Sequence, residues 1–122
     1  MIRLLIVDDE PDIIEDLTQD LSDLRDDLEI TSASTGYEAL KIIMQGTVDI
    51  VLTDIAMPDM DGNQLFARTR EYNPDLPVIM MTGFGYDPNH VVLNAKLNGL
   101  QDVLFKPFPL EKLCTLIDKY MK

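Results

Sequence analysis

The chain has little that would tie it to the cell exterior or to a membrane. Its 122 residues include a single cysteine, Cys114, which excludes an intrachain disulfide and therefore a secreted disulfide scaffold. The longest apolar stretch, residues 76–81, is far shorter than the roughly 20 residues of a membrane-spanning helix. The first residues also lack the apolar segment of a signal peptide. These absences predict a cytoplasmic protein that does not insert into membranes.

Basic residues are scarce as well. Ten Lys and Arg stand against 22 Asp and Glu, a formal net charge of −12. A surface of this charge repels phosphate backbones and anionic lipids, so we expect no direct binding of nucleic acid or of membranes. Residues 1–29 carry eleven of the acids and only two of the bases. The first helix is therefore predicted to present an acidic surface.

The length and the 46% hydrophobic content predict one compact domain over residues 1–122. Short runs rich in Ile, Val, Leu and Met indicate strands, and most of them are continuously apolar, as in a parallel sheet covered on both faces. The second run alternates more, as an edge strand does. The predicted strands are 4–7, 28–33, 49–53, 78–81 and 102–105.

Helical patterns lie between these strands. Apolar residues at 13, 14, 17, 21 and 24 form a stripe of helical period, and Pro11 suits the first turn of that helix. Right-handed crossovers then predict a doubly wound α/β fold of five βα units, whose ligand site lies beyond the carboxyl ends of the strands. The other predicted helices are 37–44, 63–72, 88–97 and 110–120.

Polar residues stand at the carboxyl ends of four of the predicted strands. Asp8, Asp9 and Glu10 follow the first strand and Asp54 follows the third, while Thr82 ends the fourth and Lys106 the fifth. If the first and third strands are neighbours, their carboxylates converge and repel one another unless a cation compensates.

A hard divalent cation is the expected compensation. Oxygen ligands favour Mg²⁺, with Mn²⁺ as a substitute, because the His and Cys ligands that Zn²⁺ prefers are lacking there. A carboxylate can also attack phosphorus, and Asp54 is the best placed to form an aspartyl phosphate. The Lys106 ammonium, the Thr82 hydroxyl and the cation would then neutralise the phosphoryl oxygens.

With these residues in view, the whole chain resembles a receiver domain of two-component response regulators. Receivers share a flavodoxin-like (βα)5 fold with strand order 2-1-3-4-5, so the resemblance implies that architecture. The resemblance is carried by four segments: LLIVDDEP at 4–11, VLTDIAMPDMDG at 51–62, PVIMMTGFG at 77–85 and VLFKPFPLEKL at 103–113.

The resemblance implies a role for each site residue. Asp9 and Asp54 would bind Mg²⁺ directly, Asp8 mainly through water, and the carbonyl of Ala56 would complete the protein ligands. Asp54 would be the phosphoacceptor and Thr82 the switch hydroxyl. Lys106 would pair with the phosphoryl group, with a cis peptide bond following it.

The resemblance also implies partners. A sensor histidine kinase or a histidine phosphotransfer protein would supply the phosphoryl group, docking near the first helix. An output domain or a second copy would read the change on the face of helix four, strand five and helix five. The TGFG segment that follows the fourth predicted strand is common in receivers that continue into a further module. A longer protein therefore remains an alternative to a stand-alone receiver.

One position departs from the receiver pattern. Val103 stands three residues before Lys106, where receivers usually carry an aromatic residue that turns inward with the switch hydroxyl. A β-branched side chain has few rotamers and gains little by turning. We therefore expect a phosphoryl mimic to perturb the amides of residues 83–92 more than that of Val103.

Other functions remain open as alternatives. A receiver-like scaffold could act without phosphorylation, although all the expected chemical positions are present. A phosphohydrolase of the haloacid-dehalogenase type would require a D-x-D nucleophile motif, which residues 54–56 and 8–10 do not supply. A flavodoxin would place a flavin phosphate where this chain is acidic. The four methionines at 57, 60, 80 and 81 are expected to pack rather than to bind a soft metal.

Overall fold

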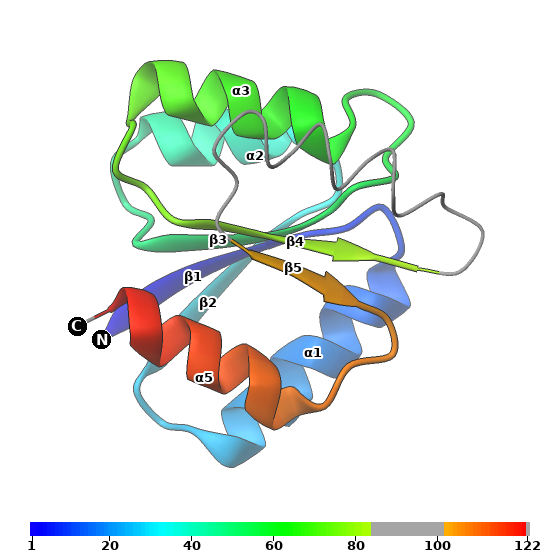
Figure 1. The fold of residues 1–122 in the computed structure, drawn as a ribbon, viewed down its shortest axis with the longest axis vertical. Helices are drawn as coiled ribbons and strands as arrows, with labels where there is room; N and C mark the ends of the chain where they lie inside the picture. Colours follow the sequence, from blue (N-terminus) through cyan, green and yellow to red (C-terminus); the bar gives the residue numbers. More distant parts are fainter. Residues whose placement is uncertain (84–101, 122) are drawn as a thin grey trace.

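The computed structural model describes residues 1–83 and 102–121 of the chain. In this part, five parallel strands form one sheet in the order β2-β1-β3-β4-β5 (Figure 1). Each described helix follows a strand along the chain. The strands are β1 (Ile2–Val7), β2 (Leu28–Ala33), β3 (Ile50–Asp54), β4 (Val78–Thr82) and β5 (Asp102–Phe105); the helices are α1 (Pro11–Leu24), α2 (Gly36–Met44), α3 (Gly62–Tyr72) and α5 (Leu110–Tyr120).

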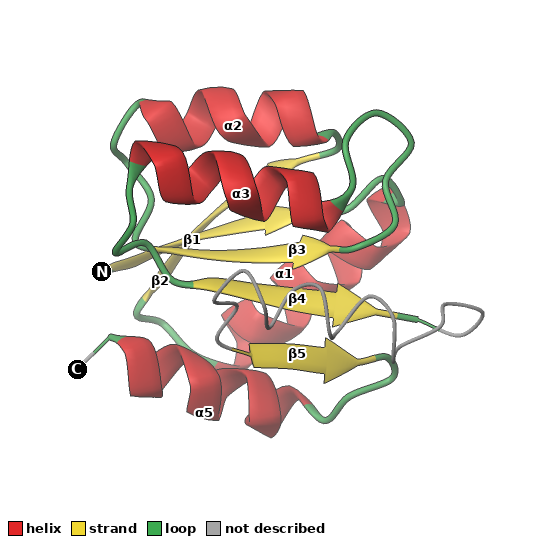
Figure 2. Cartoon of the chain, turned by 45° about the horizontal axis from the view of Figure 1, so that its top comes forward, coloured by secondary structure: helices red, strands yellow, loops and turns green. Residues whose placement is uncertain are grey.

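The sheet is the middle layer of a three-layer sandwich. Helices α1 and α5 cover one face, and α2 and α3 cover the other (Figures 1 and 2). Successive side chains of a strand point to opposite faces, so each inner strand supplies both layers of core. In β1, Leu5 and Val7 join the core under α2 and α3, while Leu4 and Ile6 join the core under α1 and α5. This is why the inner strands are apolar without alternation.

Local signals in the sequence set where the helices begin. Pro11 occupies the first turn of α1, where its missing amide hydrogen is not needed. The Thr35 hydroxyl accepts a hydrogen bond from the amide of Glu38 at 3.1 Å and caps α2. The Asp61 carboxylate accepts one from the amide of Gln64 at 2.8 Å and caps α3. Each cap fixes where the chain leaves the carboxyl edge of the sheet and turns back.

The predicted fold class and strand order are confirmed. Strand β2 lies at the edge of the sheet, as its alternating pattern indicated. The boundaries differ slightly: β1 starts two residues earlier than predicted because residues 2 and 3 also pair with β2, and Asp54 and Thr82 are the last residues of β3 and β4. The predicted helix 88–97 lies outside the described residues. Over 1–83 and 102–121, no helix is long and apolar enough to cross a membrane.

Candidate functional site

The site residues come together at the carboxyl edge of the sheet. Asp8 and Asp9 follow β1, Asp54 ends β3, Thr82 ends β4 and Lys106 follows β5. Strand β3 pairs with both β1 and β4, and β4 pairs with β5, so these four strand ends lie in one row. The structure therefore brings together residues that are up to 98 positions apart in the chain.

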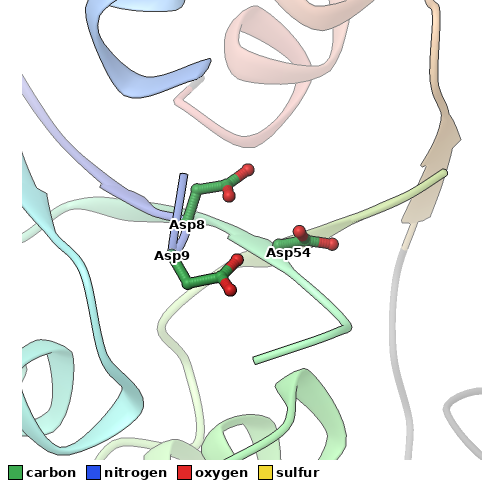
Figure 3. Close-up of side chains that lie close together, drawn as sticks. All are labelled: Asp8, Asp9 and Asp54. Carbon is green, nitrogen blue, oxygen red and sulfur yellow. The ribbon is translucent and has the colours of Figure 1, made fainter. Parts of the chain in front are cut away.

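Three carboxylates form the centre of the site. One oxygen from each of Asp8, Asp9 and Asp54 lies within 4.8 Å of the others. Figure 3 shows the three side chains lying close to one another, with Asp8 and Asp9 just after β1 and Asp54 at the end of β3. Asp8 is fully buried and Asp54 is 7% exposed, while Asp9 faces solvent. Such an oxygen-only cluster, open to water on one side, suits a hard divalent cation that keeps some of its waters.

Lys106 is the cation that the chain itself supplies to this cluster. Its ammonium donates to Asp8 Oδ2 at 3.1 Å and to Asp54 Oδ2 at 3.4 Å. The ammonium is mostly buried, which by itself lowers its pKa, but the two carboxylates outweigh this and raise the pKa of Lys106. Lys106 is therefore held in its charged form between β1 and β3.

The carboxylate cluster keeps an excess of negative charge. Three carboxylates and one ammonium leave two negative charges uncompensated. Burial raises the pKa of Asp54, and the charge of Asp8 adds to this rise, while Lys106 opposes it. The net rise in pKa means that the ionised form of Asp54 is disfavoured unless a further cation lies nearby. Perturbed carboxylates of this kind mark functional sites.

Backbone amides orient two of the carboxylates. The amide of Glu10 donates to Asp8 Oδ1 at 2.9 Å, and the amide of Ala56 donates to Asp54 Oδ1 at 3.3 Å. Each of these bonds uses one oxygen, and the other oxygen of each carboxylate faces Lys106. Ala56 thus lies next to Asp54, while the use of its carbonyl as a ligand stays a prediction.

Thr82 contributes a hydroxyl that has no partner within the described residues. Its side-chain oxygen is buried without a hydrogen bond, although its carbonyl accepts from the amide of Lys106 at 2.7 Å. A buried hydroxyl without a partner is costly, and such groups in native structures call for an explanation. Its place at the end of β4, beside the Asp54 strand, makes it available to a ligand at this edge.

One further expectation is confirmed, and one stays a prediction. The Lys106–Pro107 peptide bond is cis, as the resemblance implied. Val103 is partly buried and packs against the core under α2 and α3. Of the segment expected to respond to a phosphoryl mimic, only Gly83 lies within the described residues, so that expectation stays a prediction.

The methionines pack in the core, as expected. All four have low exposure, and Met57 and Met60 belong to the core under α2 and α3.

The sequence pattern did not predict a role for Asp59, which lies between these two methionines in the chain. Its carboxylate accepts hydrogen bonds from the amides of Gly36 and Tyr37 at the start of α2. Nothing in the local pattern around residue 59 indicates a contact 22 residues away.

A groove next to the site was also not foreseen. It has a volume of about 240 Å³ and lies between α1 and the segment around Phe108 and Leu110, and Lys106 and Met81 also line it. Asp16 and Asp20 of α1 line its rim. A second hollow continues it past Asp20 and Leu110 toward Asp23, Leu24 and Glu111.

Comparison with known proteins gives one family. Residues 4–118 match the family model described as "Response regulator receiver domain". The response regulator receiver protein CpdR of Brucella abortus is 33% identical over 123 residues, which cover 99% of this chain and 98% of CpdR. The transcriptional regulatory protein GlrR of Escherichia coli is 35% identical over 116 residues, which are 95% of this chain and 25% of GlrR. The chain thus spans about a quarter of the length of GlrR.

Solved structures agree with this result. The response regulator protein TrrA from Thermotoga maritima, crystallised in complex with Mg²⁺-BeF, has a TM-score of 0.84 and 32% identity, covering 98% of this chain and 99% of that one. A response regulator receiver domain protein from Clostridium thermocellum has a TM-score of 0.87 and 29% identity, covering 98% of this chain and 94% of that one.

Proposed function

Because the chain belongs to the family of receiver domains of two-component response regulators, we propose that it is a phosphoacceptor whose nucleophile is Asp54. The observation that carries the proposal is the meeting, at a single sheet edge, of three carboxylates, one lysine and one buried hydroxyl that has no partner among residues 1–83 and 102–121. The scaffold alternative does not explain why all five groups are present together, and the phosphohydrolase alternative lacks its D-x-D nucleophile motif at residues 54–56 and 8–10.

In the proposed reaction, a carboxylate oxygen of Asp54 attacks the phosphorus of a phosphorylated histidine. The new O–P bond forms as the P–N bond breaks, and the imidazole leaves with the electron pair and takes up a proton from solvent. Lys106, already 3.4 Å from Asp54, would move its hydrogen bond to a phosphoryl oxygen. The Thr82 hydroxyl would donate to another phosphoryl oxygen and so gain a partner that the described part of the chain does not give it.

The residues fit a divalent cation. Asp9 and Asp54 would hold Mg²⁺ directly, Asp8 mainly through water, and the carbonyl of Ala56 would complete the set, with Mn²⁺ able to replace it. The cation supplies charge that stabilises the transferring phosphoryl group. The uncompensated charge of the cluster and the raised pKa of Asp54 support this assignment. The TrrA complex with Mg²⁺-BeF supports it by similarity.

The groove beside the site is the proposed docking surface of the phosphoryl donor. Its apolar floor includes Ile13, Leu17 and Phe108, and acidic side chains of α1 line its rim. This combination of apolar and acidic side chains suits a sensor histidine kinase or a histidine phosphotransfer protein that presents an apolar side chain flanked by Lys or Arg. The groove opens next to Lys106, so a donor seated there has its histidine near Asp54.

The output is proposed to pass through the face formed by β5 and α5. Phe105 on β5 is 51% exposed, an unusual position for a large aromatic residue, and it lies on the edge strand next to α5. An output domain or a second copy of the chain could cover it. The predicted helix 88–97, which the resemblance to receivers assigns to the same face, lies outside the described residues.

We further propose that residues 1–122 form one receiver domain that works in the cytoplasm, alone or as part of a longer regulator. Direct contact with nucleic acid or membrane is not proposed for this part of the chain, given its net charge of −12. The full-length relatives include transcriptional regulatory proteins, so any DNA binding would belong to another module.

Phosphorylation of the purified protein by acetyl phosphate tests the proposal. Intact-mass measurement is expected to show one added phosphate in the presence of Mg²⁺ or Mn²⁺ and none with EDTA. Asp54→Ala is expected to abolish the addition. Asp26→Ala, which removes an exposed carboxylate far along the chain from the site residues, is the matched control and should label like the wild type. Equal labelling of Asp54→Ala would refute the assignment of the nucleophile.

A further inference from the structure

The loop between β3 and α3, residues 55–61, is held at both ends and in the middle. At its start the amide of Ile55 donates to the carbonyl of Met81 at 3.0 Å, so pairing with β4 continues past Asp54. At its end the amide of Gly62 donates back to the carbonyl of Ile55 at 2.8 Å. Met57 and Met60 are buried between these points. The loop is therefore packed on the molecule along most of its length.

Asp59 ties this loop to the start of α2. Its two carboxylate oxygens accept hydrogen bonds from the amides of Gly36 and Tyr37, each at 3.3 Å. The first amides of a helix lack partners within the helix and favour negative charge. Helix α2 already has a cap from its own segment, the Thr35 hydroxyl on the amide of Glu38. The Asp59 contact therefore adds a link between two segments rather than supplying the cap of α2.

A packing contact runs beside this polar one. A Cβ atom added at Gly36 would lie 2.7 Å from Cβ of Met60, which is closer than real Cβ contacts. The absence of a side chain at residue 36 is thus what lets the loop reach the helix. Asp59 and Met60, adjacent in the loop, both contact the first residue of α2.

The two linked segments lie on either side of the acidic cluster. Helix α2 follows β2, whose last residue, Ala33, accepts a hydrogen bond from the amide of Asp8 at 3.1 Å. The loop follows Asp54, and its second residue is Ala56, whose amide holds the Asp54 carboxylate. The Asp59 link therefore connects the segment beside Asp8 to the segment that carries Ala56.

We propose that Asp59 is a positioning residue for the cation site: by holding the β3–α3 loop against α2, it keeps Ala56 where both its amide and its carbonyl serve the site. The inference rests on the proposed metal-dependent function. Asp59 itself touches none of the three clustered carboxylates by any hydrogen bond, so its effect passes through the loop. Burial raises the pKa of Asp59, but the amides of Tyr37 and Gly36 outweigh this and lower it, so the carboxylate is ionised and accepts both bonds at neutral pH.

The test compares Mg²⁺ binding by isothermal titration calorimetry in four proteins: wild type, Asp59→Ala, Asp59→Asn and Thr35→Ala. Asp59→Ala removes both bonds and is expected to raise the dissociation constant roughly tenfold, the lower end of the effect of residues that support metal ligands. Asp59→Asn keeps one acceptor oxygen, so its loss should be smaller. Thr35→Ala removes a cap from the same helix without touching the loop and should bind Mg²⁺ like the wild type.

Three outcomes of these titrations would overturn the inference. Wild-type affinity in Asp59→Ala would show that the loop keeps its place without the link. An equal loss in Thr35→Ala would show that only the stability of α2 matters. Titrations repeated at 0.5 M salt separate a distant charge effect, which is screened, from loop positioning, which is not. A loss that disappears at high salt also counts against the inference.

Amide hydrogen exchange without metal tests the link independently of the proposed function. In Asp59→Ala we expect faster exchange at Gly36, Tyr37 and Ala56 than in the wild type, with the amide of Glu38 less affected because Thr35 still holds it. Unchanged exchange at Ala56 would overturn the inference. If the wild type binds no Mg²⁺, the proposed metal site fails instead, and the exchange result still decides whether Asp59 holds the loop.

Discussion

Replacing Asp54 by its neutral isostere should make the metal-free protein more stable. In Asp54→Asn, repulsion from Asp8 and Asp9 is removed together with the attraction to Lys106. At an effective dielectric of about 20, each repulsive pair at 4.8 Å costs about 3 kcal/mol and the attraction at 3.4 Å contributes about 5 kcal/mol. Asp9 faces solvent, so its share is screened. With the Asp9 share screened, the charge terms nearly cancel, so the predicted gain, on the order of 1 kcal/mol, comes mainly from relief of carboxylate burial, the largest cause of the raised pKa of Asp54.

The direction of the pKa shift of Asp54 determines how the stability difference between the variant and the wild type should change with pH. The pKa of Asp54 is raised in the folded state above its ordinary value of 3.8. The folded protein therefore holds this proton more tightly than the unfolded chain, and stability from this group is lost as the pH rises through the raised pKa. At pH 7 the variant should be the more stable protein. The difference should shrink as the pH falls through the raised pKa toward the ordinary value of 3.8, because the wild-type carboxyl then takes up its proton.

The assay is urea unfolding followed by circular dichroism, in EDTA and in Mg²⁺. In EDTA at pH 7 we expect the variant to have the higher free energy of unfolding and a melting temperature higher by ~4–8 °C. Mg²⁺ at one hundred times its dissociation constant adds about 2.7 kcal/mol to the wild type alone, which should reverse the order. A variant less stable than the wild type in EDTA at pH 7, or a difference that does not change with pH, would refute the reasoning.

Asp49→Asn is the matched control, because it makes the same chemical change at a carboxylate whose pKa is lowered in the folded protein, whereas that of Asp54 is raised. Asp49 accepts three hydrogen bonds from Arg3, at 2.8, 3.2 and 3.0 Å. The side-chain bonds from Arg3 lower the pKa of Asp49 and outweigh its partial burial. Its contribution to stability is therefore present above pH 3.8 and lost as the pH falls through the lowered pKa. The control should be less stable than the wild type at pH 7.

Two further predictions concern binding. Asp9→Asn should weaken Mg²⁺ binding in a calorimetric titration and raise metal-free stability by less than Asp54→Asn does, because Asp9 is exposed; an unchanged Mg²⁺ affinity would mean that the metal site is misplaced. Phosphotransfer from a protein donor should slow as salt rises, because the acidic rim at Asp16 and Asp20 attracts basic groups over a Debye length of about 8 Å. Phosphorylation by acetyl phosphate is the control, and a donor rate that is the same at low and molar salt would contradict the proposed docking surface.

Local pattern was sufficient for the elements in the described residues and for their order along the chain, while the predicted helix 88–97 stays a prediction. Continuous apolar runs indicated β3 and β4 as buried strands, and the helical spacing from Ile13 to Leu24 indicated α1, because these periods reflect which faces are buried. Boundaries were less certain. The pairing of Ile2 with Leu28 extended β1 to residues whose own pattern did not indicate a strand.

The site was predicted from the sequence only as a set of strand ends. That Asp8 and Asp54 meet depended on β1 and β3 being neighbours, which the sequence allowed and the sheet order established. The resemblance to receivers supplied the roles of Thr82 and Lys106. The charges were visible in advance, whereas the raised pKa of Asp54 depends on its burial in the folded chain.

What the sequence determined by itself was the alternation of strands and helices, the acidic character of α1 and the kinds of residue at each strand end, since all of these depend on neighbours in the chain. Only the tertiary structure decided that Asp59 holds the start of α2, that Gly36 leaves room for Met60, and that the Thr82 hydroxyl has no partner within the described residues. These are contacts, or missing contacts, between segments that folding brings together. Periodicity records which face of an element is buried, but not which residue of another element lies opposite it.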